Sequence, residues 1–393
     1  MIMFEYKYLV PDYIYRINVV NPLLELYRYS LINKYTNYII KKLCSDYNLT
    51  HSKISRKINQ YFSQLIMSIY TNRTYKYKEK IYLDDGLFNS CSDQEVMSFY
   101  HDIKYLVSID IKEDIFNIKR TIDDFLVKID DFSKNLDNTK IYTRTDDYFL
   151  INQEILDKHH FKLDNKYEIN RELYESCKKR CKDQKNYDNL ILSLLIRYRA
   201  LNSGANQYVV DLNYKKILKE KFGLNFECFG SVFNRYYDHF CSLFYDLEKY
   251  FGSLGSFMSL KVISGFYMAN PPYDENLLKK MYKRVKKNIK SDDQVCFIMS
   301  IPKWDEYDLE KLIDLDKLYD VKIIKHEKFR RDMDKKQEVL IPPYISYIFS
   351  NQSFKKNTIN YIDLVDIFSN YKNYDNTKEY YYNKKKYLDE KNK

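Results

Sequence analysis

The change in sequence pattern near residue 186 is the feature that most constrains the fold. Beyond it, short apolar runs end in Gly, Pro or Ser and alternate with helical stretches, which is typical of a sheet built from β-α units. Helices are predicted at residues 234–247 and 275–289. The predicted strands are Asn225–Phe229, Gly265–Ala269, Val295–Ile301, Tyr319–Ile324 and Ile345–Phe349. Because ligands bind outside the carboxyl ends of strands in such sheets, we expect the chemistry just after a strand.

The preceding part of the chain has a helical pattern. From about residue 22 to 185 apolar side chains recur at the spacing of one helix face. We therefore predict a helical N-terminal domain (1–185), an α/β domain (186–360) and a low-complexity C-terminal tail (361–393). The clearest helical stripes are Ile54, Ile58, Phe62, Leu65 and Ile69, and Ile111, Ile115, Ile118, Ile122, Phe125, Ile129 and Phe132.

The net charge indicates the kind of partner that the protein binds, and the cysteines indicate the cellular compartment in which it folds. The 65 Lys and Arg residues against 55 Asp and Glu leave a net charge of +10, which favours a polyanionic partner such as nucleic acid. Seven cysteines form no Cys-x-x-Cys pair, so we expect reduced thiols and no metal site. Because the N-terminus does not resemble a secretory signal and no apolar run has the length of a membrane span, we expect an intracellular protein without a membrane partner.

The segment Gly265–Tyr273 carries the most informative motif. It is an apolar strand that ends in Asn270-Pro271-Pro272-Tyr273. Methylation of an adenine amino group requires hydrogen-bond acceptors that orient the weakly nucleophilic nitrogen, and the Asn270 side-chain oxygen and the Pro271 carbonyl can supply them. Tyr273 can stack on the base, while the two prolines fix the turn. We interpret these four residues as catalytic.

An ordinary Asn-Pro turn is the competing interpretation of this motif. The chain also contains Ile341-Pro342-Pro343-Tyr344, which lacks the Asn and precedes a predicted strand, and we interpret that segment as a loop. A motif remains a hypothesis until its structural context supports it.

Two loops rich in small residues are candidate cofactor sites. One follows the strand that starts the α/β domain and leads into a predicted helix, where class I methyltransferases bind S-adenosylmethionine; the other is a Gly/Ser loop after residue 250. Neither matches the Gly-x-Gly-x-x-Gly fingerprint, which argues against a dehydrogenase. The candidate cofactor-binding residues are Glu227, Phe229, Ser231, Asn234, Phe251, Gly252, Ser253 and Gly255.

Five ordered blocks together resemble the catalytic core of the phosphorylated-CTD-interacting factor family. They cover about residues 186–350 and are Leu194–Leu201, Phe226–Asn234, Tyr250–Gly255, Asn270–Tyr273 and Phe297–Trp304. The resemblance implies an α/β fold, with a Rossmann-like class I methyltransferase core preceded here by an all-α N-terminal domain. It also implies that S-adenosylmethionine methylates N6 of the 2'-O-methyladenosine beside the cap of an mRNA 5' end.

The sequence departs from the family pattern at several places, so not every property of the family is expected in this chain. The aromatic residue after Pro-Pro is usually Phe and here is Tyr273. A WW domain needs two tryptophans and the chain has one, Trp304, so we expect no WW domain and no binding to polymerase tails. A viral or shortened relative fits this pattern, and its location would be cytoplasmic if viral and otherwise nuclear. The segment from Cys228 to Gly265 is short for two β-α units, so we expect part of the sheet to be irregular.

Basic and aromatic residues provide candidates for substrate binding. Two basic clusters occur. One is on the predicted helix after the motif: Lys279, Lys280, Lys283, Arg284, Lys286, Lys287 and Lys290. The other is in a predicted loop before the last strand: Lys325, Lys328, Arg330, Arg331, Lys335 and Lys336. We favour the second as the phosphate contact and interpret the first as a solvated face. Trp304 could stack on a base or pack in the core. Arg197, at the start of the α/β domain, could contact RNA or brace the sheet. The substrate-binding candidates are Arg197, Trp304, Lys328, Arg330 and Arg331.

Two alternatives to a cap methyltransferase stay open on the sequence. One keeps the same chemistry but takes internal RNA or DNA adenine as the substrate. The other is a catalytically silent RNA-binding or scaffold subunit, against which the intact Asn270–Tyr273 motif counts.

Overall fold

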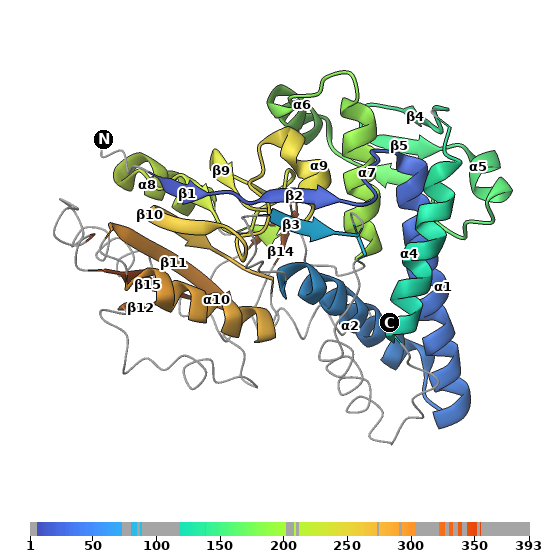
Figure 1. Ribbon diagram of the computed structural model, residues 1–393, viewed down its shortest axis with the longest axis horizontal. Helices are drawn as coiled ribbons and strands as arrows, with labels where there is room; N and C mark the ends of the chain where they lie inside the picture. Colours follow the sequence, from blue (N-terminus) through green and yellow to red (C-terminus); the bar gives the residue numbers. More distant parts are fainter. Residues whose placement is uncertain are drawn as a thin grey trace. The chain divides into compact units, whose positions relative to one another are not determined.

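The structure is a computed structural model in which the chain forms two compact units (Figure 1). The sheet unit comprises Met1–Val10, Gln207–Ser242 and Ser253–Lys393, and the helical unit comprises Pro11–Asn206 and Leu243–Gly252. The boundaries of these two units differ from the domain boundaries expected from the sequence. The expected domain boundaries stay predictions. The residues described are 6–72, 80–84, 87–88, 118–137, 139–201, 208–209, 212–272, 275–290, 293–302, 322–326, 330–332, 337–339, 344–351 and 354.

The sheet unit is built on a mixed, parallel-rich sheet. Its strand order is β12-β15-β11-β10-β8-β9, and β1 adds to β10. Strands β9, β8, β10 and β11 are parallel neighbours, whereas β15 is antiparallel to both β11 and β12 and β1 is antiparallel to β10. The mixed α/β prediction is therefore confirmed. The strands are β1 (Lys7–Leu9), β8 (Phe226–Glu227), β9 (His239–Phe240), β10 (Lys261–Ala269), β11 (Val295–Pro302), β12 (Lys322–His326) and β15 (Tyr344–Ser350).

Helices cover both faces of this sheet. Since side chains alternate between the faces of a strand, β10 and β11 contribute to two cores. On one face α10 (Glu275–Asn288) packs against Tyr267 and Phe297, and on the other α8 (Leu212–Phe222) packs against Met268 and Ile298. Figure 1 shows α10 lying along β11 and β15. The predicted helix at 275–289 is confirmed.

A second, small sheet in the same unit corrects an expectation about the basic cluster. Strand β13 (Arg330–Asp332) pairs antiparallel with β14 (Gln337–Val339) and β7 (Tyr208–Val209). The backbone of Arg330 and Arg331 is thus in a strand, where the sequence suggested a loop.

The helical unit contains the predicted helices and also strands. Its helices are α1 (Pro22–Tyr47), α2 (His51–Asn72), α4 (Ile118–Lys134), α5 (Gln153–Lys158), α6 (Arg171–Arg180), α7 (Tyr187–Ala200), α9 (Tyr245–Glu248) and the 3-10 helix η2 (Lys249–Phe251). Strands β2 (Asp12–Tyr15) and β3 (Lys80–Leu83) are parallel, and β4 (Tyr142–Arg144), β5 (Tyr148–Ile151) and β6 (Lys166–Glu168) form an antiparallel sheet.

The expectation of an all-α N-terminal domain is therefore wrong. In β5 the buried Phe149 and Ile151 alternate with the exposed Leu150, which is the two-residue period of a strand. This run is too short to stand out between the longer helical stripes. The stripe from Ile54 to Ile69 does form α2, and the part of the second stripe before Ile118 lies outside the described residues.

The predicted helix at 234–247 is also wrong. In its place the chain forms β9 and, in the helical unit, the short helix α9. The reason is that backbone groups in this segment bond to distant partners: Cys241 N–H donates to the Glu227 carbonyl at 2.9 Å and Ser242 N–H donates to the Gly255 carbonyl at 2.9 Å. The expected irregularity between Cys228 and Gly265 is confirmed.

Candidate active site at the switch point of the sheet

The carboxyl ends of β8 and β10 meet where the strand order reverses. From β8 the chain continues to β9 on one side, and from β10 it continues to β11 on the other, so the topological switch point lies between β8 and β10. Glu227 pairs with Met268, and Cys228 N–H donates to the Met268 carbonyl at 2.7 Å. Phe229 and Asn270 each stand two positions beyond that pair. This edge is the expected ligand position of the fold.

Asn270 and Pro271 come directly after β10. Asn270 is 9% exposed, Pro271 is buried and Pro272 is exposed, so the turn passes from the core to the surface within three residues. The preceding Ala269 is paired with Met299 of β11, which holds the start of the turn on the central strand of the sheet. Tyr273 lies outside the described residues.

The turn after β8 is shaped by two of the predicted cofactor residues. Ser231 N–H donates to Asn234 Oδ1 at 2.7 Å, and Asn234 N–H donates to Ser231 Oγ at 3.2 Å. Gly230 N–H donates to the Cys241 carbonyl at 2.8 Å. These reciprocal bonds resemble those that cap a helix N-terminus, so both side chains fix the conformation of the turn. Phe229 is half-buried with its ring edge-on to Phe257 at 5.7 Å, and it offers an aromatic surface at the switch point.

Glu227 is held inside the sheet unit. One carboxylate oxygen forms an ion pair with Lys215 Nζ of α8, and the other accepts from Tyr236 N–H at 3.1 Å. Glu227 is 2% exposed and Lys215 is 0% exposed. These contacts give Glu227 a structural role beside its predicted role in cofactor binding, which stays a prediction.

Ser253 and Gly255 form a second turn of the sheet unit. Ser253 Oγ lies 2.6 Å from Ser242 Oγ and accepts from Gly255 N–H at 3.1 Å. Leu254 N–H donates to the Phe240 carbonyl at 2.9 Å, which ties this turn to the end of β9. The φ of Gly255 is 81°, a conformation that glycine adopts readily.

The other two predicted cofactor residues, Phe251 and Gly252, belong to the helical unit. Phe251 is buried, and its ring lies 6.2 Å from that of Tyr187. Gly252 ends η2 with φ 91° and donates its N–H to the Lys249 carbonyl at 3.1 Å.

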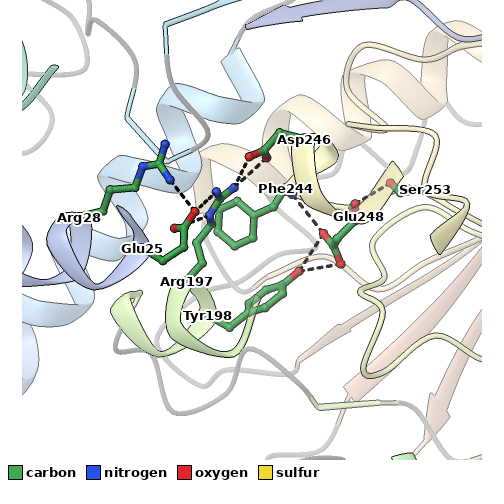
Figure 2. Close-up of polar contacts among 9 residues, drawn as sticks. Glu25, Arg28, Arg197, Tyr198, Phe244, Asp246, Glu248 and Ser253 are labelled. Carbon is green, nitrogen blue, oxygen red and sulfur yellow. Dashed lines mark hydrogen bonds and ion pairs between the residues drawn. The ribbon is translucent and has the colours of Figure 1, made fainter. Parts of the chain in front are cut away.

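A buried charge network fixes the segment that leads to Phe251 (Figure 2). Arg197 of α7 donates to both carboxylate oxygens of Asp246, at 2.7 and 2.8 Å, and its Nε donates to Glu25 of α1 at 3.0 Å. Arg28 contacts the same Glu25 at 2.5 Å. Burial raises the pKa of Asp246, and the neighbouring Arg197 opposes that rise.

A second buried carboxylate holds the same segment. Glu248 is fully buried and accepts hydrogen bonds from the Tyr198 hydroxyl and, at 3.2 Å, from Phe244 N–H (Figure 2). The substrate-binding role of Arg197 stays a prediction, and its observed contacts are with carboxylates of its own unit.

The remaining predicted substrate residues have little or no described side-chain structure. Trp304 and Lys328 lie outside the described residues. The side chains of Arg330 and Arg331 are likewise not described, although their backbone belongs to β13.

The sequence analysis missed Lys215 and Asp246, the charged partners of two predicted site residues. A signal existed for Lys215, since it stands three and seven positions before the buried Leu218 and Phe222 and so shares their helix face. A lysine on an apolar face usually has a buried partner. Asp246 follows no such pattern, because its segment is irregular.

The switch point suits a flat, polar ligand. Phe229 presents an aromatic surface, Gly230 carries no side chain there, and Asn270 brings an amide to the same edge. Within the described ranges, three or more His, Cys, Asp or Glu side chains nowhere gather in a way that could hold a metal ion. No helix in the described part of the chain is both long and apolar enough to cross a membrane.

Comparisons with known proteins agree with the resemblance seen in the sequence. Residues 169–328 match the family described as "Phosphorylated CTD interacting factor 1 WW domain". A protein of Mus musculus named mRNA (2'-O-methyladenosine-N(6)-)-methyltransferase is 40% identical over 90 residues, and its Homo sapiens counterpart is 39% identical over 90 residues. The matches cover 23% of this chain and 13% of each relative. The resemblance to the phosphorylated-CTD-interacting factor family is thereby confirmed over the matched segment.

The family match also corrects an expectation. The sequence led us to expect no WW domain, whereas the matched family carries a WW domain in its description. The single tryptophan was therefore an insufficient criterion. The expectation that the chain does not bind polymerase tails rested on the same tryptophan count and has lost its basis.

Proposed function

We propose that this chain, which matches the phosphorylated-CTD-interacting factor family over residues 169–328, is an adenosine N6-methyltransferase that acts on capped mRNA. The main support is the position of Asn270-Pro271-Pro272 at the carboxyl end of β10, which lies at the switch point of a parallel-rich sheet. The names of the mouse and human relatives support the cap-adjacent 2'-O-methyladenosine as the substrate. The strand order and the position of the motif also support a Rossmann-like class I methyltransferase core.

Asn270 and Pro271 orient the reacting nitrogen in this proposal. The Asn270 side-chain oxygen and the Pro271 carbonyl accept hydrogen bonds from the adenine amino group, which favours a pyramidal nitrogen whose lone pair is no longer delocalised into the ring. The amino group loses one proton to solvent as it is methylated. Because the prolines restrict the backbone, the acceptors are held in place before the substrate arrives. Tyr273 stacks on the base.

The turns after β8 and β9 hold the cofactor. Phe229 and the turn closed by Ser231 and Asn234 form one wall, and the turn of Ser253 and Gly255 forms another. When bound, S-adenosylmethionine supplies an electrophilic methyl group. The buried network around Arg197 serves the helical unit by fixing the segment that bears Phe251.

A substrate panel tests the proposal. The purified protein is incubated with labelled S-adenosylmethionine and with RNA oligomers that start with cap-adenosine, cap-2'-O-methyladenosine, cap-guanosine or uncapped adenosine. The products are digested and identified by mass spectrometry. We expect N6-methyladenosine from the cap-2'-O-methyladenosine RNA and no product from cap-guanosine. Equal labelling of the uncapped RNA would replace the cap assignment with an internal-adenine enzyme, and no labelling of any RNA would favour a silent subunit.

A further inference from the structure

The outer face of α10 is a dense stripe of lysines. Its inner face, formed by Leu277, Leu278, Met281, Tyr282 and Val285, is buried in the core of the sheet unit. On the outer face Lys283 and Lys287 are exposed and Lys279 and Lys286 are half-exposed, and the exposed Lys290 lies in the turn directly after the helix. We call these five residues the α10 stripe. They recur at spacings of three and four residues and therefore lie on one side of the helix.

The α10 stripe differs from lysine-bearing faces on three other helices. There an exposed lysine has an acidic partner four residues away: Lys42 pairs with Asp46 on α1, Lys134 pairs with Asp130 on α4, and Lys216 pairs with Glu220 on α8. Such i,i+4 pairs are typical of a solvated face. The sequence of α10 contains one acid, Glu275 at its first position, against six basic residues.

The charges of Lys283, Lys286, Lys287 and Lys290 are therefore not balanced from within the helix, because its one acid lies eight or more residues before them. Among the described residues, no ion pair involves Lys283, Lys286, Lys287 or Lys290. Side chains of like charge three or four residues apart weaken a helix. Their accumulation on one face is better explained by an external polyanion than by solvation alone.

Arg284 belongs to the same basic helix but not to the α10 stripe. It donates to the Met258 carbonyl at 2.7 Å, and its guanidinium lies 5.4 Å from the centre of the Phe257 ring. It therefore fastens α10 to the rest of the unit, which gives the stripe a fixed position on the sheet.

The position of α10 connects the stripe with the candidate active site. The helix starts at Glu275, five positions after Asn270, and is the crossover between the parallel strands β10 and β11. Such a crossover runs back from the carboxyl edge of the sheet. A 14-residue helix spans about 21 Å, so the stripe leads from near the switch point toward the opposite edge. An RNA whose 5' nucleotide reacts at Asn270 must extend away from that edge, and it carries one negative charge at each phosphate.

We propose that the α10 stripe binds the phosphodiester backbone of the RNA downstream of the methylated nucleotide. The inference rests on the proposed function, because that function places the 5' end at Asn270. It revises the sequence-based interpretation of this cluster as a solvated face. The contact is electrostatic and carries no base specificity, so it depends on salt and on RNA length.

Three charge-neutral substitutions test the α10 stripe. The variant carries Lys283→Gln, Lys287→Gln and Lys290→Gln. A matched control carries Lys34→Gln, Lys41→Gln and Lys57→Gln, which remove three exposed lysines from α1 and α2. A second control replaces the three α10 lysines with Arg, which keeps their charge. Circular dichroism checks that all variants are folded.

Binding and turnover are measured separately. Fluorescence anisotropy gives the Kd of a capped RNA of about 20 nucleotides over a range of salt concentrations; the α10 variant should bind roughly ten- to hundredfold more weakly at about 0.1 M salt, with a salt slope lower by about 2. Both controls should bind as the wild type does. Turnover of a capped dinucleotide, too short to reach the stripe, should be unchanged in all three variants.

The outcomes separate this inference from the proposed function. An unchanged salt slope in the α10 variant, or an equal loss in the α1–α2 control, would overturn the role of the stripe. If the variant instead lost binding to phosphatidylserine vesicles while its RNA affinity stayed at the wild-type value, the stripe would be a membrane surface. If the proposed function is wrong, the wild type will methylate neither the capped RNA of about 20 nucleotides nor the capped dinucleotide. The anisotropy titration would still show whether the α10 stripe binds RNA.

Discussion

Arg197 and Asp246 form a buried ion pair that fixes the segment 243–252 within the helical unit. Arg197 Nη1 lies 2.7 Å from one carboxylate oxygen and 2.8 Å from the other, and the two side chains are 0% and 6% exposed. Glu25 contacts the opposite side of the same guanidinium. One arginine of α7 thus joins a carboxylate of α1 to one of α9, so the conformation of the segment depends on a single side chain.

Replacing Arg197 with Met should destabilise the protein severely. The methionine fills similar space but leaves the Asp246 carboxylate in a buried position without the guanidinium that it contacts. We expect a loss of about 3–5 kcal/mol in the free energy of unfolding, measured by urea denaturation. The double variant Arg197→Met, Asp246→Leu should recover part of that loss.

An exposed ion pair provides the comparison for this experiment. Lys134 and Asp130 of α4 lie 2.8 Å apart with side chains 62% and 36% exposed. Lys134→Met should shift the urea midpoint far less than Arg197→Met, because both charges of this pair are hydrated. A similarly small loss in Arg197→Met would show that the buried network contributes little to stability.

Asn270→Ala should remove methyl transfer and leave the fold intact. Asn270 follows the last residue of β10, and in the proposed mechanism its amide acts on the substrate. Loss of one preorganised hydrogen-bond partner typically lowers kcat by about 10²–10³-fold. The measurement is kcat on the cap-2'-O-methyladenosine RNA together with the thermal midpoint. Asn135→Ala, at an exposed position of the helical unit, is the matched control; wild-type kcat in Asn270→Ala would contradict the assigned role.

Gly265→Ala should destabilise the central strand. Gly265 has φ 137°, and a Cβ there would lie 2.8 Å from Tyr6 Cδ1 and 2.9 Å from the Tyr267 hydroxyl. We expect a cost of roughly 2–4 kcal/mol from backbone strain and crowding. At Gly230 a Cβ would meet its nearest atoms of Phe240 at 3.5 Å, so Gly230→Ala should cost no more than about 1 kcal/mol. Equal unfolding midpoints for the two variants would refute the steric argument.

The fold was predictable where local pattern and final contacts agree. The apolar run at 265–269 belongs to β10, which is buried on both faces of the sheet, and the stripe at 275–289 belongs to α10, which buries one face against that sheet. The predicted helix at 234–247 does not form, because backbone groups of this segment form hydrogen bonds with partners distant in sequence. No periodicity could indicate that Ser242 bonds to the turn at Gly255.

How well the sequence predicted the position and contacts of a site residue differs from one residue to the next. Asn270 and Pro271 follow from a motif whose chemistry is local, and the structure places them at a strand end. Ser231 and Asn234 were predicted as cofactor contacts, and their observed bonds close a turn on each other. Arg197 was predicted because its block, Leu194–Leu201, resembles the family. Its carboxylate partners come from residues 172 and 49 positions away, which sequence spacing cannot reveal.

The stability of the sheet unit should fall in mild acid because of His239. Its Nδ1 lies 3.2 Å from the Tyr8 hydroxyl and its ring stacks on Phe226. Burial lowers the pKa of His239 below the ordinary 6.5, although Asp238 opposes this shift. As the pH falls below 6.5 the unfolded chain therefore binds a proton that the folded chain does not, so stability is retained above that pH and lost toward the folded-state pKa. Between about pH 7.5 and about pH 5.5 the urea midpoint should drop less in His239→Phe than in the wild type, and an NMR titration of the wild-type imidazole should give a midpoint below 6.5. A midpoint at or above 6.5, or equal drops in both proteins, would contradict this coupling.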